Sequence, residues 1–243
     1  MFRPGLFFKG LVNLIYPLCC QSCGLKLELT NTRYLCKSCW NKISKNQQPF
    51  CIKCGMTLPN SAEERPQCEA CSKKDYAFTR AWSTGLYQGT LKECIHLLKY
   101  NKKVFMAEPM GKLMTDFIKR YLDLENIDLI IPVPLHPAKL REREFNQSAL
   151  LAEQINKRFN IPLSLNNLVK VRPTRPQAGL SGKERVANIQ LAFKVKNSSL
   201  FSEKNVLLVD DVFTTGSTIN ECSTALAQSG INNIYVLTLA RTN

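Results

Sequence analysis

The chain has 243 residues, of which 44% are hydrophobic and 21% are charged, and this composition excludes a wholly disordered or fibrous protein. Its length fits one full domain with a small second unit, and no stretch holds the ~18 uncharged apolar residues that a transmembrane helix needs. Lysine and arginine number 33 against 19 acidic residues, and the resulting net charge of +14 favours an anionic partner such as nucleic acid, phosphates or an anionic membrane surface.

Residues 1–19 hold apolar side chains at helical spacing, and no small-residue cleavage site follows them. The pattern predicts a short helix packed on the protein itself rather than a signal peptide. Docking of this helix at a membrane surface is the alternative. The predicted localisation is cytoplasmic, and the alternative places the protein at the inner face of the cytoplasmic membrane.

The first third of the chain is rich in cysteine. Nine of the eleven cysteines lie between residues 19 and 71, and eight of the nine form four C-x-x-C pairs. The pairs are Cys20 with Cys23, Cys36 with Cys39, Cys51 with Cys54, and Cys68 with Cys71. A C-x-x-C pair can direct two thiolates to one tetrahedral ion, so two such pairs complete a four-cysteine zinc site.

The four pairs predict two zinc ions, each held in a zinc ribbon. Both ions are expected to be structural, because four thiolates leave no open position for water or substrate. Sharing of an ion by consecutive pairs is the simplest arrangement, and a cross-braced sharing by alternate pairs stays open. Cys19 is expected to be a spare thiol, whereas Cys94 and Cys222 fall in predicted helices and are expected in the core.

From about residue 76 the sequence alternates between apolar strands and amphipathic helices. The predicted strands span residues 80–87, 127–133, 206–209 and 234–240, and the predicted helices span 91–100, 105–122, 146–159 and 217–229. Continuous apolar strands that alternate with helices indicate an α/β fold, with a parallel sheet covered by helices on both faces. We therefore predict a small zinc-ribbon domain at residues 1–75 and an α/β domain at residues 76–243.

The strongest chemical signal lies at residues 206–218, where an apolar strand leads through two adjacent acids into a turn rich in threonine and serine. Gly216 permits a tight turn, and the hydroxyl and N–H groups around it can cradle a phosphate monoester at the start of a helix. Asp210 and Asp211 can accept hydrogen bonds from vicinal sugar hydroxyls or hold a magnesium ion. The alternative is a helix-capping Thr/Ser cluster that follows two incidental acids.

This stretch resembles the phosphoribosyl pyrophosphate (PRPP) signature of the type I phosphoribosyltransferases. The resemblance implies a type I phosphoribosyltransferase-like fold and a site for PRPP with magnesium. It places the ribose 2- and 3-hydroxyls on Asp210 and Asp211, and the 5-phosphate on residues 214–218. The implied phosphoribose site consists of Asp210, Asp211, Val212, Phe213, Thr214, Thr215, Gly216, Ser217 and Thr218.

Other motifs are similar to those of the ComF family of competence-associated proteins. They comprise Pro132-Val133-Pro134-Leu135-His136 with Arg141, Arg143, Phe145, Asn146 and Gln147, then Lys99-Tyr100, and finally Arg172, Thr174, Gln177, Arg185 and Asn188. A double zinc ribbon at the N-terminus is also characteristic of this family, so the resemblance covers essentially the whole chain. One residue departs from the pattern, since Glu144 stands where the family usually has glycine. If that position needs a positive φ, the turn around it must rearrange.

The resemblance to phosphoribosyltransferases also implies that a loop near Lys99 binds pyrophosphate. The candidates for binding pyrophosphate or another anion are Lys99, Tyr100, Pro134, His136, Arg141, Arg143 and Arg185. The alternative for each arginine is a solvated basic surface without a ligand, and for His136 it is a hydrogen-bonded loop histidine. No catalytic residue is assigned from the sequence.

Two functions remain open at this point. The ComF resemblance implies a part in natural transformation, in which the protein handles incoming single-stranded DNA beside a competence helicase or a recombination mediator. The alternative is an active phosphoribosyltransferase that exchanges the pyrophosphate of PRPP for an unknown acceptor. Aromatic residues interleaved with lysines on the ribbons predict a DNA-stacking surface, and packing of the small ribbon cores is the alternative for them. These aromatic residues are Tyr34, Trp40, Phe50 and Tyr76.

Overall fold

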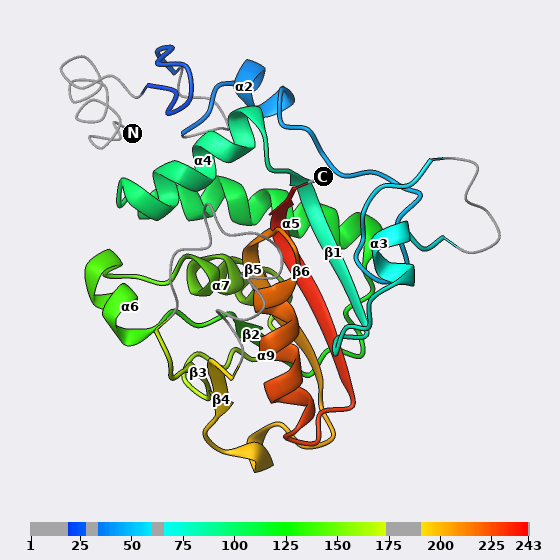
Figure 1. The fold of residues 1–243 in the computed structure, drawn as a ribbon. Helices are drawn as coiled ribbons and strands as arrows, with labels where there is room; N and C mark the ends of the chain where they lie inside the picture. Colours follow the sequence, from blue (N-terminus) through cyan, green and yellow to red (C-terminus); the bar gives the residue numbers. More distant parts are fainter. Residues whose placement is uncertain (1–18, 28–33, 60–65, 174–190, 243) are drawn as a thin grey trace, which may run out of the picture.

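The computed structural model describes residues 19–27, 34–59, 66–173 and 191–242. At its centre lies a four-stranded parallel sheet in the order β1-β6-β5-β2 (Figure 1). The strands are β1 (Arg80–Leu86), β2 (Leu129–Pro132), β5 (Asn205–Phe213) and β6 (Asn233–Arg241). The predicted parallel sheet is confirmed, and β5 is longer than predicted because Asp210 and Val212 still pair with β6.

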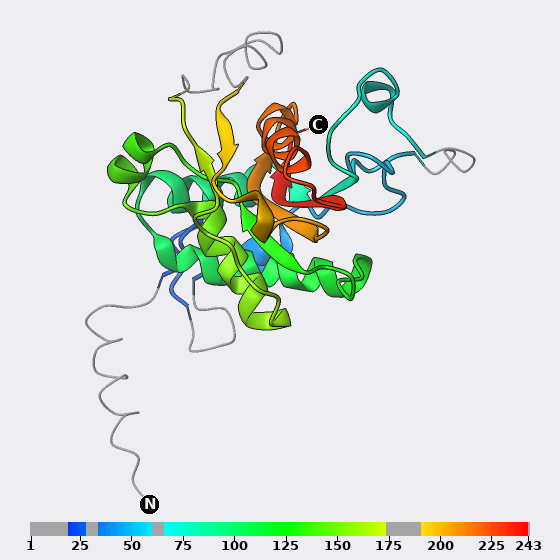
Figure 2. The ribbon, with the colours of Figure 1, turned by 90° about the horizontal axis from the view of Figure 1, so that it is seen from below.

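Helices cover both faces of the sheet, as predicted. The longer helices are α4 (Gly89–Tyr100), α5 (Ala107–Tyr121), α7 (Gln147–Phe159) and α9 (Ser217–Ala227). The first three pack on one face and α9 packs on the other (Figure 2). Successive residues of β5 point alternately to the two faces of the sheet. Leu207 and Val209 pack on the α4, α5 and α7 side, whereas Val206 and Leu208 pack on the α9 side.

Several short elements are not predicted from the sequence. They are α2 (Lys37–Asn41), α3 (Glu69–Ser72), α6 (Pro137–Arg143), the 3-10 turns η1 (Val104–Met106) and η2 (Ser198–Leu200), and the antiparallel strands β3 (Leu168–Lys170) and β4 (Phe193–Val195). Helix α6 has a single leucine, Leu140, so its sequence shows no apolar period, and this leucine is exposed. Its start depends on Pro137 in the first turn and on His136, whose Nδ1 accepts a hydrogen bond from the Ala138 N–H at 3.2 Å.

The cysteine-rich segment contacts both faces of the sheet. Its buried cysteines at 20–39 belong to the core beneath α4 and α5, and those at 51–71 belong to the core beside α9. Between them the chain follows the outer edge of β1, where Lys45 bridges to Gly85. This bridge covers backbone groups that an edge strand otherwise leaves unpaired. The domain division at residue 76 stays a prediction.

Three further expectations concern single segments or residues. Cys94 and Cys222 are fully buried in the two cores, which confirms their expected role as small core residues. The helix predicted at residues 1–19 lies outside the described residues, except for Cys19. Within the described ranges, none of the helices combines the length and the apolar character needed to cross a membrane.

Candidate functional site

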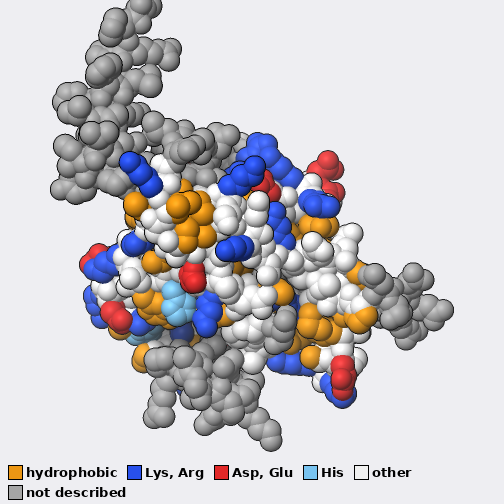
Figure 3. Space-filling model, turned by 90° about the horizontal axis from the view of Figure 1, so that it is seen from above, with side chains coloured by type: hydrophobic (Ala, Val, Ile, Leu, Met, Phe, Trp, Pro, Cys, Tyr) orange, Lys and Arg blue, Asp and Glu red, His pale blue; other side chains and the backbone are white. Residues whose placement is uncertain are grey.

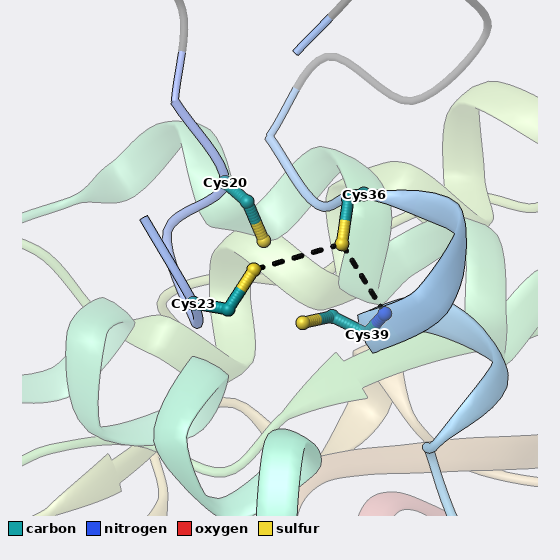
Figure 4. Close-up of side chains that lie close together, drawn as sticks. All are labelled: Cys20, Cys23, Cys36 and Cys39. Carbon is teal, nitrogen blue, oxygen red and sulfur yellow. Dashed lines mark hydrogen bonds between the residues drawn. The ribbon is translucent and has the colours of Figure 1, made fainter. Parts of the chain in front are cut away.

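The eight cysteines of the C-x-x-C pairs form two clusters. The first cluster comprises Cys20, Cys23, Cys36 and Cys39, and the second cluster comprises Cys51, Cys54, Cys68 and Cys71. Within each cluster, all four sulfur atoms lie within 4.8 Å of one another, and Figure 4 shows those of the first cluster pointing toward a common centre. Consecutive pairs therefore share a site, and the cross-braced alternative is wrong.

The spacing of the sulfur atoms fits zinc. A tetrahedral ion with Zn–S bonds of ~2.3 Å holds its sulfurs about 3.8 Å apart. In the first cluster the Sγ atoms of Cys23 and Cys36 lie 3.7 Å apart. In the second cluster the Sγ atoms of Cys54 and Cys68 also lie 3.7 Å apart. Both clusters thus fit one structural zinc ion each.

The two clusters differ in their surroundings. Cys23 of the first cluster is exposed, whereas all four cysteines of the second cluster are buried. Arg241 of β6, itself only 5% exposed, donates from Nη1 to the Cys54 carbonyl at 2.8 Å and lies 3.6 Å from the Cys54 Sγ. Its guanidinium also lies over the Phe213 ring, 5.4 Å from the ring centre. Because a zinc ion with four thiolates carries a charge of −2, Arg241 neutralises part of a buried charge.

The two acids lie at the carboxyl end of β5, where helices α7 and α4 hold them. Asp210 is 7% exposed and Asp211 is 4% exposed. The Asp210 Oδ1 accepts hydrogen bonds from the Ser148 hydroxyl at 2.7 Å and from the Asp211 N–H at 2.9 Å. The Asp211 Oδ2 forms an ion pair with the Lys99 Nζ at 2.6 Å. Two carboxylates and one ammonium therefore meet in one buried place.

Burial and mutual repulsion change the acidity of this group. Burial, assisted by the negative charge of Asp211, raises the pKa of Asp210 to about 7, although the Ser148 hydroxyl and Lys99 act in the opposite direction. Burial by itself lowers the pKa of Lys99, but the Asp211 carboxylate outweighs burial, so the pKa of Lys99 is raised. Lys99 is therefore a cation at neutral pH, while Asp210 exchanges its proton near neutrality.

The turn at residues 214–218 joins β5 to α9. Gly216 has a φ of 73° and precedes the first residue of α9. A Cβ atom at this position would lie 2.7 Å from the Phe213 ring, so both the backbone angle and the available space require glycine. The hydroxyls of Thr215 and Ser217 lie 2.8 Å apart. The turn thus presents several hydroxyls at a helix N-terminus, next to the acids.

The predicted anion-binding residues are not all brought to the acids. Lys99 contacts Asp211 directly, and the half-buried His136 caps α6. Arg143 is buried, donates from Nη1 to the Gln147 Oε1 at 2.6 Å, and lies over the exposed Tyr100 ring. Pro134 is half-buried, Arg141 is exposed on α6, and Arg185, like Thr174, Gln177 and Asn188, lies outside the described residues.

Glu144 takes the conformation that glycine would take. Its φ is 72°, it ends helix α6, and its carboxylate forms an ion pair with the Lys102 ammonium. The expected rearrangement of the turn is therefore wrong, because a glutamate held in the left-handed region preserves it at a cost of about 1 kcal/mol. The following Asn146 caps α7, where its Oδ1 accepts from the Ser148 N–H at 3.0 Å.

Sequence reasoning misses three contacts of this site. The Ser148 bond to Asp210 and the Arg241 bond to Cys54 join residues that are 62 and 187 positions apart. The Lys74 Nζ, on the chain that leaves the second cluster, donates to the Thr215 carbonyl at 3.3 Å. No local sequence pattern predicts these contacts, because each depends on how elements far apart in the chain pack together.

The aromatic residues of the ribbons pack inward. Phe50 is buried against Phe117 and Tyr121, and Tyr76 stacks on Phe78 with ring centres 4.7 Å apart. Tyr34 pairs with Phe105, and Trp40 packs on the core beneath α4. These contacts support the packing alternative, most clearly for the buried Phe50, and the stacking surface on the ribbons stays a prediction.

Two family models match the chain. The double zinc ribbon domain matches residues 11–72, which contain both cysteine clusters. The phosphoribosyl transferase domain matches residues 146–243, which contain the acids and the 214–218 turn. Together with the parallel sheet, these matches confirm the predicted fold class.

Known proteins are similar over most of the chain. Competence protein F of Haemophilus influenzae is 35% identical over 91% of this chain and 96% of its own length. DNA utilization protein YhgH of Escherichia coli K12 is 28% identical over 94% of this chain and 99% of its own length. Competence protein ComFC of Streptococcus pneumoniae is 23% identical over 85% of this chain and 86% of its own length.

Proposed function

The chain belongs to the ComF family of competence proteins, and on that basis we propose that it handles incoming single-stranded DNA in natural transformation. The names of its relatives, competence protein and DNA utilization protein, support this role. The net charge of +14 also supports it, because a surplus of lysine and arginine attracts the DNA backbone.

We propose further that the strand-to-helix connection at the end of β5 binds PRPP or a related 5-phosphoribosyl group. The observation that carries this proposal is that Asp210, Asp211 and the 214–218 turn occupy one strand-to-helix connection, with Lys99 beside them. The turn offers hydroxyl and N–H donors to the 5-phosphate. The two carboxylates can accept hydrogen bonds from the ribose hydroxyls.

Lys99 is proposed to bind the pyrophosphate group. An ammonium has three N–H donors, so Lys99 can keep its bond to the Asp211 Oδ2 and still donate to a phosphate oxygen. Magnesium bound with PRPP would neutralise part of the pyrophosphate charge. The carboxylates of Asp210 and Asp211 are ligands of the type that magnesium prefers.

The exposed aromatic ring of Tyr100 supports DNA binding. Tyr100 follows Lys99 in the sequence and is 63% exposed. Its ring centre lies 5.4 Å from the Arg143 guanidinium and 5.3 Å from the His96 ring centre. Bases of single-stranded DNA stack on such rings while cations bind its phosphates. Figure 3 shows lysine and arginine side chains spread among hydrophobic ones over one face of the molecule.

Salt dependence tests DNA binding in the purified protein. We expect log affinity for single-stranded DNA to fall with log salt by roughly 0.7 for each phosphate contact. Replacement of the exposed Lys37, Lys42 and Lys45 by glutamine should flatten this dependence. Replacement of Lys53 should flatten it as well, because a bond to the neutral Phe78 carbonyl leaves the Lys53 charge in place, whereas Asp210→Asn should leave the dependence nearly unchanged. Affinity that does not change with salt would reject backbone recognition.

A second candidate function is phosphoribosyl transfer to an unknown acceptor. The observation that favours it is that both carboxylates, the turn glycine and a paired lysine are in place at the end of β5. Release of pyrophosphate from PRPP, assayed with and without single-stranded DNA, tests this activity directly.

A deletion strain of a competent host separates the two functions. We expect its transformation to fail after DNA has entered the cell envelope, with nucleotide metabolism unchanged. Normal transformation combined with a nucleotide or salvage defect would reject the DNA-handling role and favour phosphoribosyl transfer.

A further inference from the structure

The chain that leaves the second cluster reaches the 214–218 turn. Lys74, three residues after Cys71, donates from Nζ to the Thr215 carbonyl at 3.3 Å. The preceding lysine does not take part in this contact. Lys73 forms an ion pair with the Glu69 Oε1 at 2.6 Å on an exposed surface of α3. The two adjacent lysines of one ribbon therefore have different surroundings.

Other contacts hold this segment against the turn. A Cβ atom at Gly216 would lie 3.1 Å from the Tyr76 ring, so that ring borders the turn. The Lys74 Nζ lies over the same ring, 4.7 Å from its centre. The Ala77 N–H donates to the Asn220 Oδ1 of α9 at 2.8 Å. Lys74 is thus fixed beside the turn by neighbours on both sides.

The charge of Lys74 is available to an anion. A backbone carbonyl is a neutral acceptor and uses one of the three N–H donors of the ammonium. Within the described residues Lys74 forms no ion pair. A half-buried ammonium beside a turn of hydroxyl and N–H donors suits a phosphate monoester, which carries up to two negative charges.

We propose that Lys74, supplied by the second zinc ribbon, binds the phosphate group that occupies the 214–218 turn. This assignment rests on the proposed phosphoribose site. It adds to that site a phosphate-binding residue from outside the phosphoribosyltransferase-like fold. It also gives the second cluster a part in ligand binding, because the metal fixes the short chain between Cys71 and Lys74. The first cluster has no such connection among the described contacts.

The test uses the full-length, zinc-loaded protein and calorimetric titration with two probes, ribose 5-phosphate and magnesium PRPP. Loss of a charge-assisted hydrogen bond should weaken the binding of both probes by about tenfold or more in Lys74→Gln. The matched control Lys73→Gln should bind both probes as the wild type does. Lys74→Arg keeps the charge and should recover most of the affinity. Zinc content and the unliganded melting temperature show that each variant is folded.

The outcomes separate this assignment from the proposed function. If the wild type binds the probes and Lys74→Gln binds them equally well, the assignment of Lys74 is wrong and the phosphoribose site stands. If Lys74→Gln and Lys73→Gln weaken binding equally, the effect is one of net charge and the assignment is also wrong. If the wild type binds neither probe, the phosphoribose site itself is rejected, and Lys74 with it.

Discussion

The two cysteine clusters use the same C-x-x-C pairs but lie in unlike places. The first cluster packs beneath α4 and leaves Cys23 exposed to solvent. The second cluster is wholly buried on the opposite face of the sheet, beside Arg241 and close to the chain that carries Lys74. The same local sequence motif therefore supports one metal site with an exposed cysteine and one that is wholly buried and close to the 214–218 turn.

The difference shows how a buried charged centre is tolerated. A centre of charge −2 that keeps one thiolate in contact with water needs little compensation from the protein. The second cluster has no such contact, and the protein places a buried guanidinium against Cys54. Four predictions test this comparison, and they are ordered from the largest expected effect to the smallest.

Loss of a ligand from the second cluster should have the largest effect. Cys51→Ser leaves three buried thiolates without a complete metal site and should destabilise the protein by at least ~5 kcal/mol, because structural zinc supplies much of the folding free energy of a small metal domain. Cys20→Ser, at the corresponding position of the first cluster, should cost less, because that site can be hydrated at Cys23. Elemental analysis should find one zinc per chain in each variant. Equal melting temperatures for the two would remove the distinction between the clusters.

Removal of the compensating cation should have the next largest effect. Arg241→Gln leaves the charge of the second cluster uncompensated and should lower the free energy of unfolding by about 3–5 kcal/mol. The control is Lys103→Gln, whose ammonium donates to the Gln21 Oε1 at 2.6 Å beside the first cluster. This control should cost about 1 kcal/mol or less in urea unfolding. A cost for Arg241→Gln no larger than the control would show that Arg241 does not compensate the cluster.

The buried acids at the end of β5 should respond to pH through Asp210. Its folded-state pKa of about 7 lies above the ~3.9 of an unfolded aspartate, so its contribution to stability is present below about pH 4 and is lost as the pH rises through 7. Asp210→Asn cannot ionise and should be more stable than the wild type at pH 8 by up to about 4 kcal/mol. The difference should shrink as the pH falls toward 4.

The control for this prediction is Asp116→Asn, since Asp116 is an exposed residue that pairs with Lys112. Thermal unfolding between pH 4 and pH 8 should give nearly parallel profiles for this control and the wild type. A profile of Asp210→Asn that also runs parallel to the wild type would contradict the raised pKa.

The smallest effect is expected at Glu144, whose partner Lys102 adjoins the lysine beside the first cluster. Glu144→Gly should raise the free energy of unfolding by about 0.5 kcal/mol, because relief of the left-handed strain slightly exceeds the cost of a flexible glycine and a lost surface ion pair. Lys102→Gln removes the same ion pair without changing φ and serves as the control. A Glu144→Gly variant less stable than Lys102→Gln would show that the flexibility of glycine costs more than the strain that it relieves.

Local patterns account for much of the fold and for part of the site. The spacing of the cysteines predicts two zinc sites, and the apolar runs predict the four strands of the sheet and its helices. The run from Asp210 to Thr218 predicts the acids and the turn, because strand, acids and glycine follow one another in the sequence.

Local sequence patterns do not predict the contacts between residues that are far apart in the chain. The two clusters have identical motifs, so their unequal burial depends on what packs over them. The pairing of Lys99 with Asp211 follows from α4 lying beside β5 and has no local signal. Helix α6 is short and has one leucine, so no period marks it. The hydrogen bond from Lys74 to the Thr215 carbonyl depends on the path of the chain that leaves the second cluster.

The measurement that tests the account most directly is the binding of magnesium PRPP to the zinc-loaded protein. The wild type should melt at a higher temperature with PRPP, since a ligand at a hundred times its dissociation constant contributes about 2.7 kcal/mol. The double variant Asp210→Asn, Asp211→Asn should show no shift, because both acceptors of the sugar hydroxyls are lost. A wild-type melting curve that millimolar PRPP leaves unchanged, or an equal shift in the double variant, would contradict a phosphoribose site at the end of β5.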